Sequence, residues 1–378
     1  MNKLNEVIYL KKILTLGIIV SFVILLYSCK NNASITNNEN DFDINTASNV
    51  VDNYMNLLIK EDYDAARSFY SAKLSKNEKA LPITELKFIG YTVEEESQVG
   101  KNGFFKLRVS RTNFTEPNAS LEIYSMKLIK DAGEYKIDEV KAEQEKEVFL
   151  LDGGIRIRNK DSIKTNLVFD KFNLPQYVYA KTDGAKVFKI LLDITNFGML
   201  LPSYKGDSVA IATYGKDSFI GVVKIDESMM TQGTATDGQS SSQGGGSQGS
   251  GSSGSSGDSG SSLPAKESPI GKEVVVIDYL RDTKVTRMIF SQDEKFLLLQ
   301  YKDNIGSKIG LYRADNGELA SFDFNASYPL DMVDIYFSSF GKDVLNYDII
   351  PKSNANADGQ KLRGKWQLSL KDFKAKKL

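Results

Sequence analysis

Cys29 is the residue of this chain whose setting points most clearly to a chemical modification, and it is the only cysteine among 378 residues. It directly follows Leu26-Tyr27-Ser28, at the end of an apolar segment that begins after Lys11-Lys12. A single cysteine cannot form an internal disulfide, so the fold must rest on its hydrophobic core.

The chain contains no histidine, which excludes Ser-His-Asp and Cys-His catalysis as well as histidine metal sites. A mechanism that uses carboxylates stays open, with Asp278, Asp334 and Asp348 as the candidates. The acidic run Glu94-Glu95-Glu96 is expected to be a solvated strand edge, because neighbouring side chains of a strand point to opposite faces. We predict no catalytic residue, no metal ligand and no cofactor site.

The apolar segment, residues 13–27, has the length of a signal sequence. As a helix it would be about 22 Å long, which is shorter than the roughly 30 Å hydrocarbon core of a bilayer. With the basic residues before it, residues 1–28 are typical of a secretory signal peptide. An uncleaved signal anchor with a buried free thiol is the alternative.

The ending Leu26-Tyr27-Ser28-Cys29 resembles the lipobox of bacterial lipoproteins, with an apolar residue at −3 and a small one at −1; tyrosine at −2 is less usual. The resemblance implies cleavage between Ser28 and Cys29 and a thioether-linked diacylglycerol on Cys29. Two acyl chains suffice for stable anchoring. The expected location is the extracytoplasmic face of the cell membrane of a bacterium, of Gram-positive type.

Two further segments of the chain are unusual in composition. Residues 29–45 are polar and rich in asparagine, as expected of a flexible tether. Residues 228–268 contain a Gly/Ser/Gln tract that cannot bury a core and is expected to be disordered. The 48 basic and 49 acidic residues nearly cancel, which argues against nucleic acid as a partner.

Residues 46–148 are predicted to form an α+β domain. Apolar residues at helical spacing indicate a helix over 47–60 and a short one over 62–70, and alternating segments separated by Gly-rich turns then indicate four antiparallel strands. The segment 57–66 and the closing segment 133–138 resemble NTF2-like domains of exported bacterial proteins. That resemblance implies a cone-shaped pocket, which serves catalysis in some families and only binding in others.

Residues 149–378 are predicted to be all β. A serine, a turn and a charged residue four places on precede an apolar strand three times, at Ser203, Ser291 and Ser338. The last two are 47 residues apart and the first two are 88 apart, an excess that equals the 41 residues from 228 to 268. The tract is therefore expected to be a hairpin loop inserted within one repeat, because loop closure entropy grows only slowly with length.

A period in the forties with about four strands per unit resembles β-propeller blades. An open or partial propeller and a twisted β-sandwich are the alternatives. The function expected from these features is a non-enzymatic surface lipoprotein that binds a protein or small-ligand partner in the cell envelope. A glycan hydrolase and a structural subunit of a membrane complex remain alternatives, and an exposed apolar patch on the β domain would favour the subunit.

Overall fold

The computed structural model describes residues 42–76, 84–181, 183–194, 196–228 and 267–378. The chain from Phe42 to Leu378 forms one compact unit. The expected signal peptide 1–28, the lipid site Cys29, the cleavage point after Ser28 and most of the tether 29–45 lie outside the described residues. So do residues 229–266 of the expected insertion.

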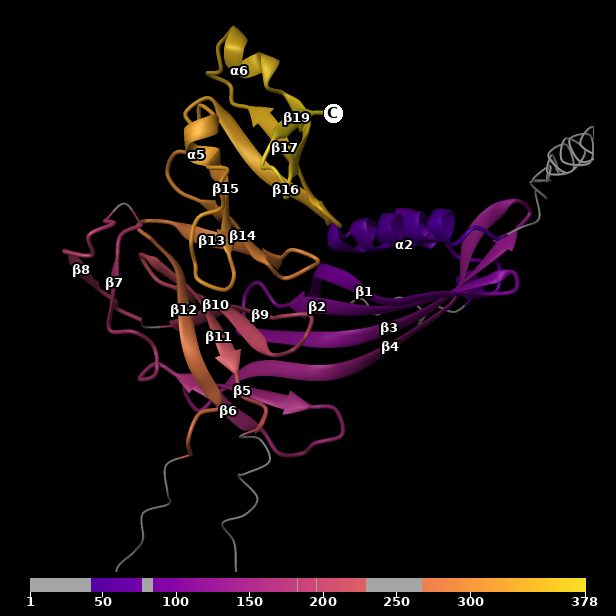
Figure 1. The fold of residues 1–378 in the computed structure, drawn as a ribbon, viewed down its shortest axis with the longest axis horizontal. Helices are drawn as coiled ribbons and strands as arrows, with labels where there is room; N and C mark the ends of the chain where they lie inside the picture. Colours follow the sequence, from indigo (N-terminus) through magenta and orange to yellow (C-terminus); the bar gives the residue numbers. More distant parts are fainter. Residues whose placement is uncertain (1–41, 77–83, 182, 195, 229–266) are drawn as a thin grey trace, which may run out of the picture. The chain divides into compact units, whose positions relative to one another are not determined.

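The described part of the chain is mostly β, in curled antiparallel sheets (Figure 1). The helices are α2 (Ile44–Ile59), α3 (Tyr63–Arg67), the 3-10 helix η1 (Leu74–Lys76), α5 (Phe324–Ser327) and α6 (Ala357–Lys361). The first sheet has six strands in sequence order, β1 (Lys87–Val99), β2 (Asn102–Thr112), β3 (Asn118–Asp131), β4 (Glu134–Leu151), β5 (Gly154–Asn159) and β6 (Asn166–Asp170).

Three further sheets and one hairpin follow. The hairpin is β7 (Tyr177–Tyr179) with β8 (Lys189–Leu191). The second sheet is β9 (Asn196–Pro202), β10 (Ser208–Tyr214), β11 (Ser218–Ile225) and β12 (Gly271–Leu280). The third is β13 (Lys284–Phe290), β14 (Phe296–Lys302) and β15 (Ser307–Arg313), and the fourth is β16 (Val333–Gly341), β17 (Val344–Pro351), β18 (Gly364–Ser369) and β19 (Ala375–Lys377).

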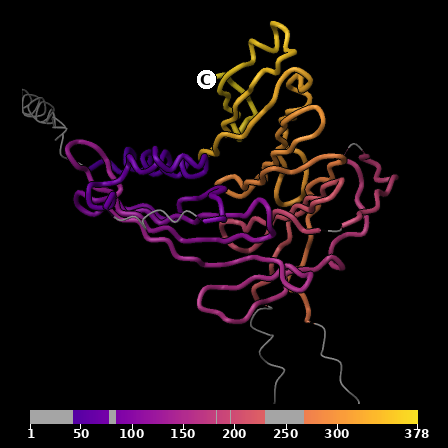
Figure 2. Tube along the Cα trace, turned by 180° about the vertical axis from the view of Figure 1, so that it is seen from behind, coloured from indigo at the N-terminus to yellow at the C-terminus, as the bar shows by residue number. Residues whose placement is uncertain are grey.

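Helix α2 forms where the sequence predicted a helix, and it begins at a well-made cap. The Asp43 carboxylate accepts hydrogen bonds from the backbone N–H groups of Asn45 and Thr46, at 3.1 and 3.2 Å. Its apolar face packs against the long strands β1–β4, beside which the helix runs in Figures 1 and 2. On the buried side of the helix, the hydroxyl of Tyr54 lies 2.9 Å from the hydroxyl of Tyr70, so these buried polar atoms are paired.

The first sheet continues across the expected domain boundary. Residues 148 and 149 lie within β4, which pairs with β5, and β5 pairs with β6. The chain reverses between β4 and β5 at Asp152-Gly153, both at positive φ (51° and 77°). Asp152-Gly153 therefore forms a tight hairpin turn inside one sheet.

The Gly/Ser/Gln tract lies between two strands that pair with each other. β11 and β12 are antiparallel neighbours from Ser218 opposite Leu280 to Ile225 opposite Gly271. The tract is thus inserted between adjacent strands of one sheet, where the repeat spacing placed it.

Of the three segments with the common serine spacing, those that begin at Ser203 and Ser291 form the same turn. Ser203 donates its N–H to the carbonyl of Ser208 at 2.9 Å, and the N–H of Ser208 donates to Ser203 Oγ at 3.1 Å. Ser291 and Phe296 make the same pair of hydrogen bonds at 2.9 and 3.0 Å. The turns join β9 to β10 and β13 to β14, so they occupy matching places in consecutive sheets.

The third pattern has a different structure. Ser338 lies inside β16, at an irregularity in its pairing with β17, and the two strands are joined by a tight turn at which Gly341 faces Val344. The common serine spacing therefore marks equivalent turns at Ser203 and Ser291 and does not mark one at Ser338.

Candidate functional site

The structure brings Asp334 and Asp348 together and places Asp278 in another sheet. The pairing of β16 with β17 makes Asp334 and Asp348 diagonal neighbours on one face. Asp334 also lies 3.7 Å from the ammonium group of Lys352. Asp278 belongs to β12 and accepts a hydrogen bond from the hydroxyl of Tyr312. Asp278 and Asp334 therefore already serve contacts within the fold.

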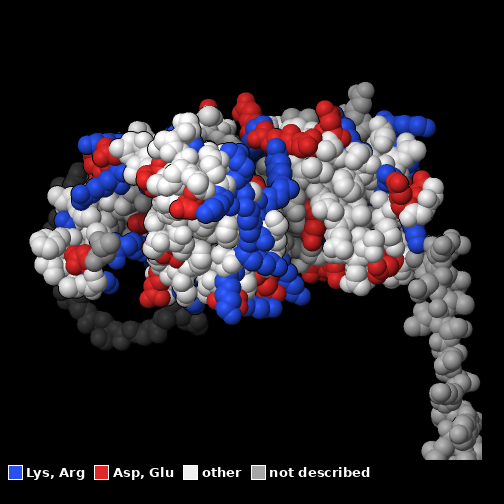
Figure 3. All heavy atoms as spheres, turned by 90° about the horizontal axis from the view of Figure 1, so that it is seen from above, with Lys and Arg blue, Asp and Glu red and all other residues white. Residues whose placement is uncertain are grey.

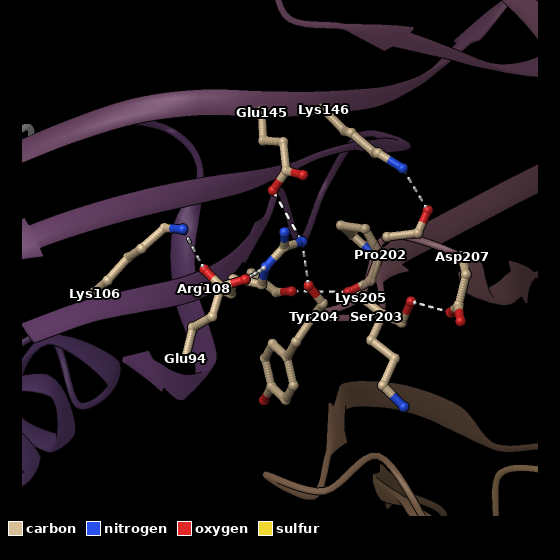
Figure 4. Close-up of polar contacts among 12 residues, drawn as sticks. Glu94, Lys106, Arg108, Glu145, Lys146, Pro202, Ser203, Tyr204, Lys205 and Asp207 are labelled. Carbon is tan, nitrogen blue, oxygen red and sulfur yellow. Dashed lines mark hydrogen bonds and ion pairs between the residues drawn. The ribbon is translucent and has the colours of Figure 1, made fainter. Parts of the chain in front are cut away.

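A second group of charged residues, of which the sequence had drawn attention only to Glu94, lies where the first sheet meets the turn after β9 (Figure 4). Arg108 of β2 stands between two carboxylates: its Nε lies 3.0 Å from Glu94 of β1, and its Nη1 lies 3.0 Å from Glu145 of β4. The same Nη1 donates to the carbonyl of Tyr204 at 3.0 Å. Arg108 thus fixes the turn on the sheet through charge-assisted hydrogen bonds.

Two more side chains of the first sheet bind backbone carbonyls of β9 and its turn. The Ser110 hydroxyl donates to the carbonyl of Pro202 at 2.8 Å, and the Lys146 ammonium donates to the carbonyl of Gly206 at 2.9 Å. Lys146 is buried and also pairs with Glu227. Such contacts satisfy carbonyl groups that have no strand partner at this junction.

Tyr204 is the centre of this junction. Its ring is buried, and its hydroxyl donates to the carbonyl of Phe290, the last residue of β13, at 3.1 Å. It reaches that position because residue 90 of β1 is glycine: a Cβ there would lie 2.2 Å from the Tyr204 hydroxyl oxygen. Three sheets therefore meet around one side chain.

Glu294 links the two equivalent turns. Its Oε1 accepts the backbone N–H of Lys205 at 3.0 Å, and its Oε2 lies 3.6 Å from the Lys205 ammonium. Its backbone has a φ of 60°, at the place where the other turn has Gly206 with a φ of 73°. Non-glycine residues rarely adopt this conformation. Burial raises the pKa of the Glu294 carboxyl.

Glu94 and Glu294 line the same hollow, whose volume is about 350 Å³. Hydrogen bonds from Lys106, followed by Arg108, lower the pKa of Glu94, so the two carboxyls are shifted in opposite directions. A neighbouring hollow of about 320 Å³ shares Lys205 and Glu294 with the first. The acidic run, expected to be a solvated edge, therefore supplies Glu94 to an ion-pair network with Arg108 and Lys106, and Glu95 also lies 3.4 Å from the Lys106 ammonium.

A third feature is the β7–β8 hairpin, whose outer face is apolar. In its register Tyr177 faces Leu191 and Tyr179 faces Lys189, while Val178 points inward and is buried. The exposed fraction of Leu191 is 77%. The Lys189 ammonium lies 4.2 Å from the centre of the Tyr177 ring.

The loop into β8 adds to this apolar surface. Val187 and Phe188 are 63% and 76% exposed, and their backbone N–H groups both donate to the Asp183 carboxylate, at 2.9 and 2.8 Å. The loop is thus held by its own hydrogen bonds while it presents two apolar side chains. The signal in the sequence is the mostly apolar run over 187–192, which was not interpreted as a binding surface.

The described residues lack two features, a metal-binding cluster and a membrane-spanning helix. No group of three or more Cys, Asp or Glu side chains in this part of the chain is placed to hold a metal ion. None of the helices in the described ranges combines the length and apolar character that a membrane crossing requires.

Comparisons with known proteins give distant structural neighbours only. No family model matches the chain, and no curated protein matches it. A chain from a structural and mechanistic study of two prolyl endopeptidases is 10% identical, with a TM-score of 0.26, over 87% of this chain and 55% of that one. TolB from Acinetobacter baumannii is 9% identical, with a TM-score of 0.21, over 67% of this chain and 61% of TolB. The chain thus spans less than two thirds of the length of either.

Proposed function

We propose that this protein is a membrane-anchored, non-enzymatic binding module of the cell envelope, and that the β7–β8 hairpin is its contact with a protein partner. The observation that carries the proposal is the apolar outer face of that hairpin. Contiguous exposed apolar surface is a mark of interaction sites, because it is costly to leave in water. The aromatic rings of Tyr177, Tyr179 and Phe188 are of the kind found at the centre of interfaces.

The anchor in this proposal is a diacylglycerol on Cys29, supported by the lipobox Leu26-Tyr27-Ser28-Cys29 and the apolar segment before it. Cys29→Ala should release the protein into the medium with its β sheets still folded. Retention of this variant at the membrane would contradict lipid anchoring.

The contact through the hairpin is tested by crosslinking in the native envelope. A photoreactive residue at position 191 should give a discrete adduct, and the same residue at position 163 should not, although Ile163 is 97% exposed. Phe188→Asp should abolish the adduct from position 191. Equal, diffuse crosslinking from both positions would count against a docking surface on the hairpin. This experiment also addresses the structural-subunit alternative, since such a subunit would show one stoichiometric adduct.

We further propose an NTF2-like fold for residues 46–148 and a propeller-like arrangement for residues 149–378. The order of two helices and four antiparallel strands in the first part, and the sheets of three or four strands with two matching serine turns in the second, support this assignment.

An envelope glycan hydrolase is the second candidate, favoured by the two carboxyls of opposite pKa shift in the hollow beside Arg108. Acid–base catalysis needs such a pair. Release of soluble fragments from purified envelope glycan, lost in both Glu94→Gln and Glu294→Gln, would establish this activity and overturn the non-enzymatic proposal.

A further inference from the structure

The C-terminal eighteen residues concentrate positive charge in a chain that is nearly neutral. Between 361 and 378 there are seven basic residues and one acidic residue, Asp372, whereas the whole chain has a net charge of −1. All seven basic residues are exposed: Lys361, Arg363, Lys365, Lys371, Lys374, Lys376 and Lys377. We call this set the basic edge.

The fold gathers these residues at one border of the fourth sheet. β19 is the last strand of that sheet and pairs with β18, so that Gln367 faces Lys376. Lys365 and Lys376 therefore share one face, while Leu368 points to the other and is buried. Figure 3 shows Lys and Arg gathered in a stripe on the face seen from above, the side on which Figure 1 places β19 and the C-terminus.

The ion pairs of the basic edge are exposed to solvent, and other anions can take the place of their carboxylates. Lys371 lies 2.8 Å from Asp343, and Lys374 lies 3.2 Å from Asp372. Both lysines are more than 70% exposed, and their acidic partners are about half exposed. Pairs of this kind contribute little to stability and are screened by salt, so other anions can replace the carboxylates.

We propose that the basic edge docks on the anionic lipid headgroups of the membrane that holds the protein. This inference rests on the proposed membrane anchoring, because the headgroups of that membrane are then the anionic surface close to the protein. Phe42 is the thirteenth residue after Cys29. The segment between them can span at most about 45 Å, so an anchored protein stays close to the bilayer. Near such a surface each Lys or Arg strengthens attraction, and the effect ends within about 10 Å of the headgroups.

The test uses the lipidated full-length chain, purified from membranes and reconstituted into vesicles of neutral phosphatidylcholine or of phosphatidylcholine with phosphatidylglycerol. An amine-reactive reagent followed by peptide mass spectrometry gives the modification rate of each lysine. Rates at Lys371, Lys374, Lys376 and Lys377 should fall about five-fold or more in the anionic vesicles, since one lysine near the surface corresponds to roughly that factor. High salt should restore them.

Controls lie in the same molecule. Lys216 and Lys284, which are exposed and distant in sequence from both the basic edge and Phe42, should react equally on both vesicles. In the variant Lys371→Gln/Lys374→Gln/Lys376→Gln the slowing at Lys377 should disappear, whereas Lys101→Gln/Lys141→Gln/Lys216→Gln should keep it. Equal rates at the basic edge on both vesicles, or slowing that salt does not reverse, would overturn the inference. Vesicle flotation reports anchoring separately, so loss of the anchor is distinguishable from loss of docking.

Discussion

Gly90 and Tyr204 form a steric lock between β1 and the turn after β9, and the lock can be tested by substitution. In Gly90→Ala the new Cβ would lie 2.2 Å from the Tyr204 hydroxyl oxygen, against about 3.4 Å for an ordinary contact. The hydroxyl must move by about 1 Å, and its 3.1 Å hydrogen bond to the Phe290 carbonyl is then lost.

The cost is the sum of three contributions. Overpacking a filled core typically costs about 1–3 kcal/mol, and a lost hydrogen bond about 1 kcal/mol, while alanine gains roughly 0.5–1 kcal/mol over glycine in a strand. We expect the free energy of unfolding to fall by about 2 kcal/mol in Gly90→Ala. Tyr204→Phe alone should cost about 1 kcal/mol, because only the hydrogen bond is removed.

The double variant distinguishes a steric clash with the Tyr204 hydroxyl from a loss of stability that has another cause. Without the hydroxyl, the nearest atoms to an alanine Cβ at position 90 are carbons at 3.4 Å, which is close to normal contact. Gly90→Ala/Tyr204→Phe should therefore be about as stable as Tyr204→Phe, with a coupling energy of about 2 kcal/mol. Urea unfolding followed by the fluorescence of Trp366, the only tryptophan, gives each value.

Additive losses in the double variant would refute the steric lock. Gly184→Ala is the matched control, because no heavy atom within 4 Å would meet its Cβ, and it should leave the unfolding midpoint almost unchanged.

Three other predictions concern the same junction and the tract. Arg108→Leu leaves Glu94 and Glu145 without their shared cation, and we expect a loss of about 2 kcal/mol in urea unfolding; an unchanged midpoint would show that the ion pairs do not stabilise the junction. Burial raises the pKa of the Glu294 carboxyl in the folded protein, so the contribution of Glu294 to stability is present at low pH and is lost as pH rises through the folded pKa. The pKa of Glu94 is lowered in the folded protein, so the contribution of Glu94 to stability is lost as pH falls through the folded pKa. Glu294→Gln and Glu94→Gln should therefore change the slope of melting temperature against pH in opposite directions, and equal slopes would contradict the assigned environments. Deletion of residues 229–266 should shift the melting temperature by only a few degrees, and a fall of about ten degrees or more would contradict the description of the tract as a tolerated insertion.

The sequence predicted helices and strands well where they depend on residues that are close together in the chain. The helix over 47–60 corresponds to α2, and the strands predicted over 85–143 correspond to β1–β4, because alternation and turn residues act within a few positions. The position of the tract was derived from the spacing of three serines, of which only Ser203 and Ser291 form equivalent turns.

The junction could not be predicted, because its partners are distant in sequence. Arg108 and Tyr204 are 96 residues apart, and Tyr204 and Phe290 are 86 apart. Alternation assigned Glu94 to a solvated edge, yet the pairing of β1 with β2 shifts register between Val93 and Glu95, and Glu94 contacts Arg108. A turn such as Asp152-Gly153 looks the same in sequence whether it joins two strands or two domains, so the continuation of the first sheet beyond β4 was not visible.

The pairing of β11 with β12 has a consequence for proteolysis. A protease that cleaves the chain between Ser228 and Glu267 breaks one peptide bond and leaves the pairing of β11 with β12 intact, because the ladder from Ser218 opposite Leu280 to Ile225 opposite Gly271 lies wholly outside that interval. The part from Glu267 onward, which carries β12–β19, would stay bound to the part before Ser228 as a noncovalent complex. Cleavage there would change the covalent chain without shedding either half.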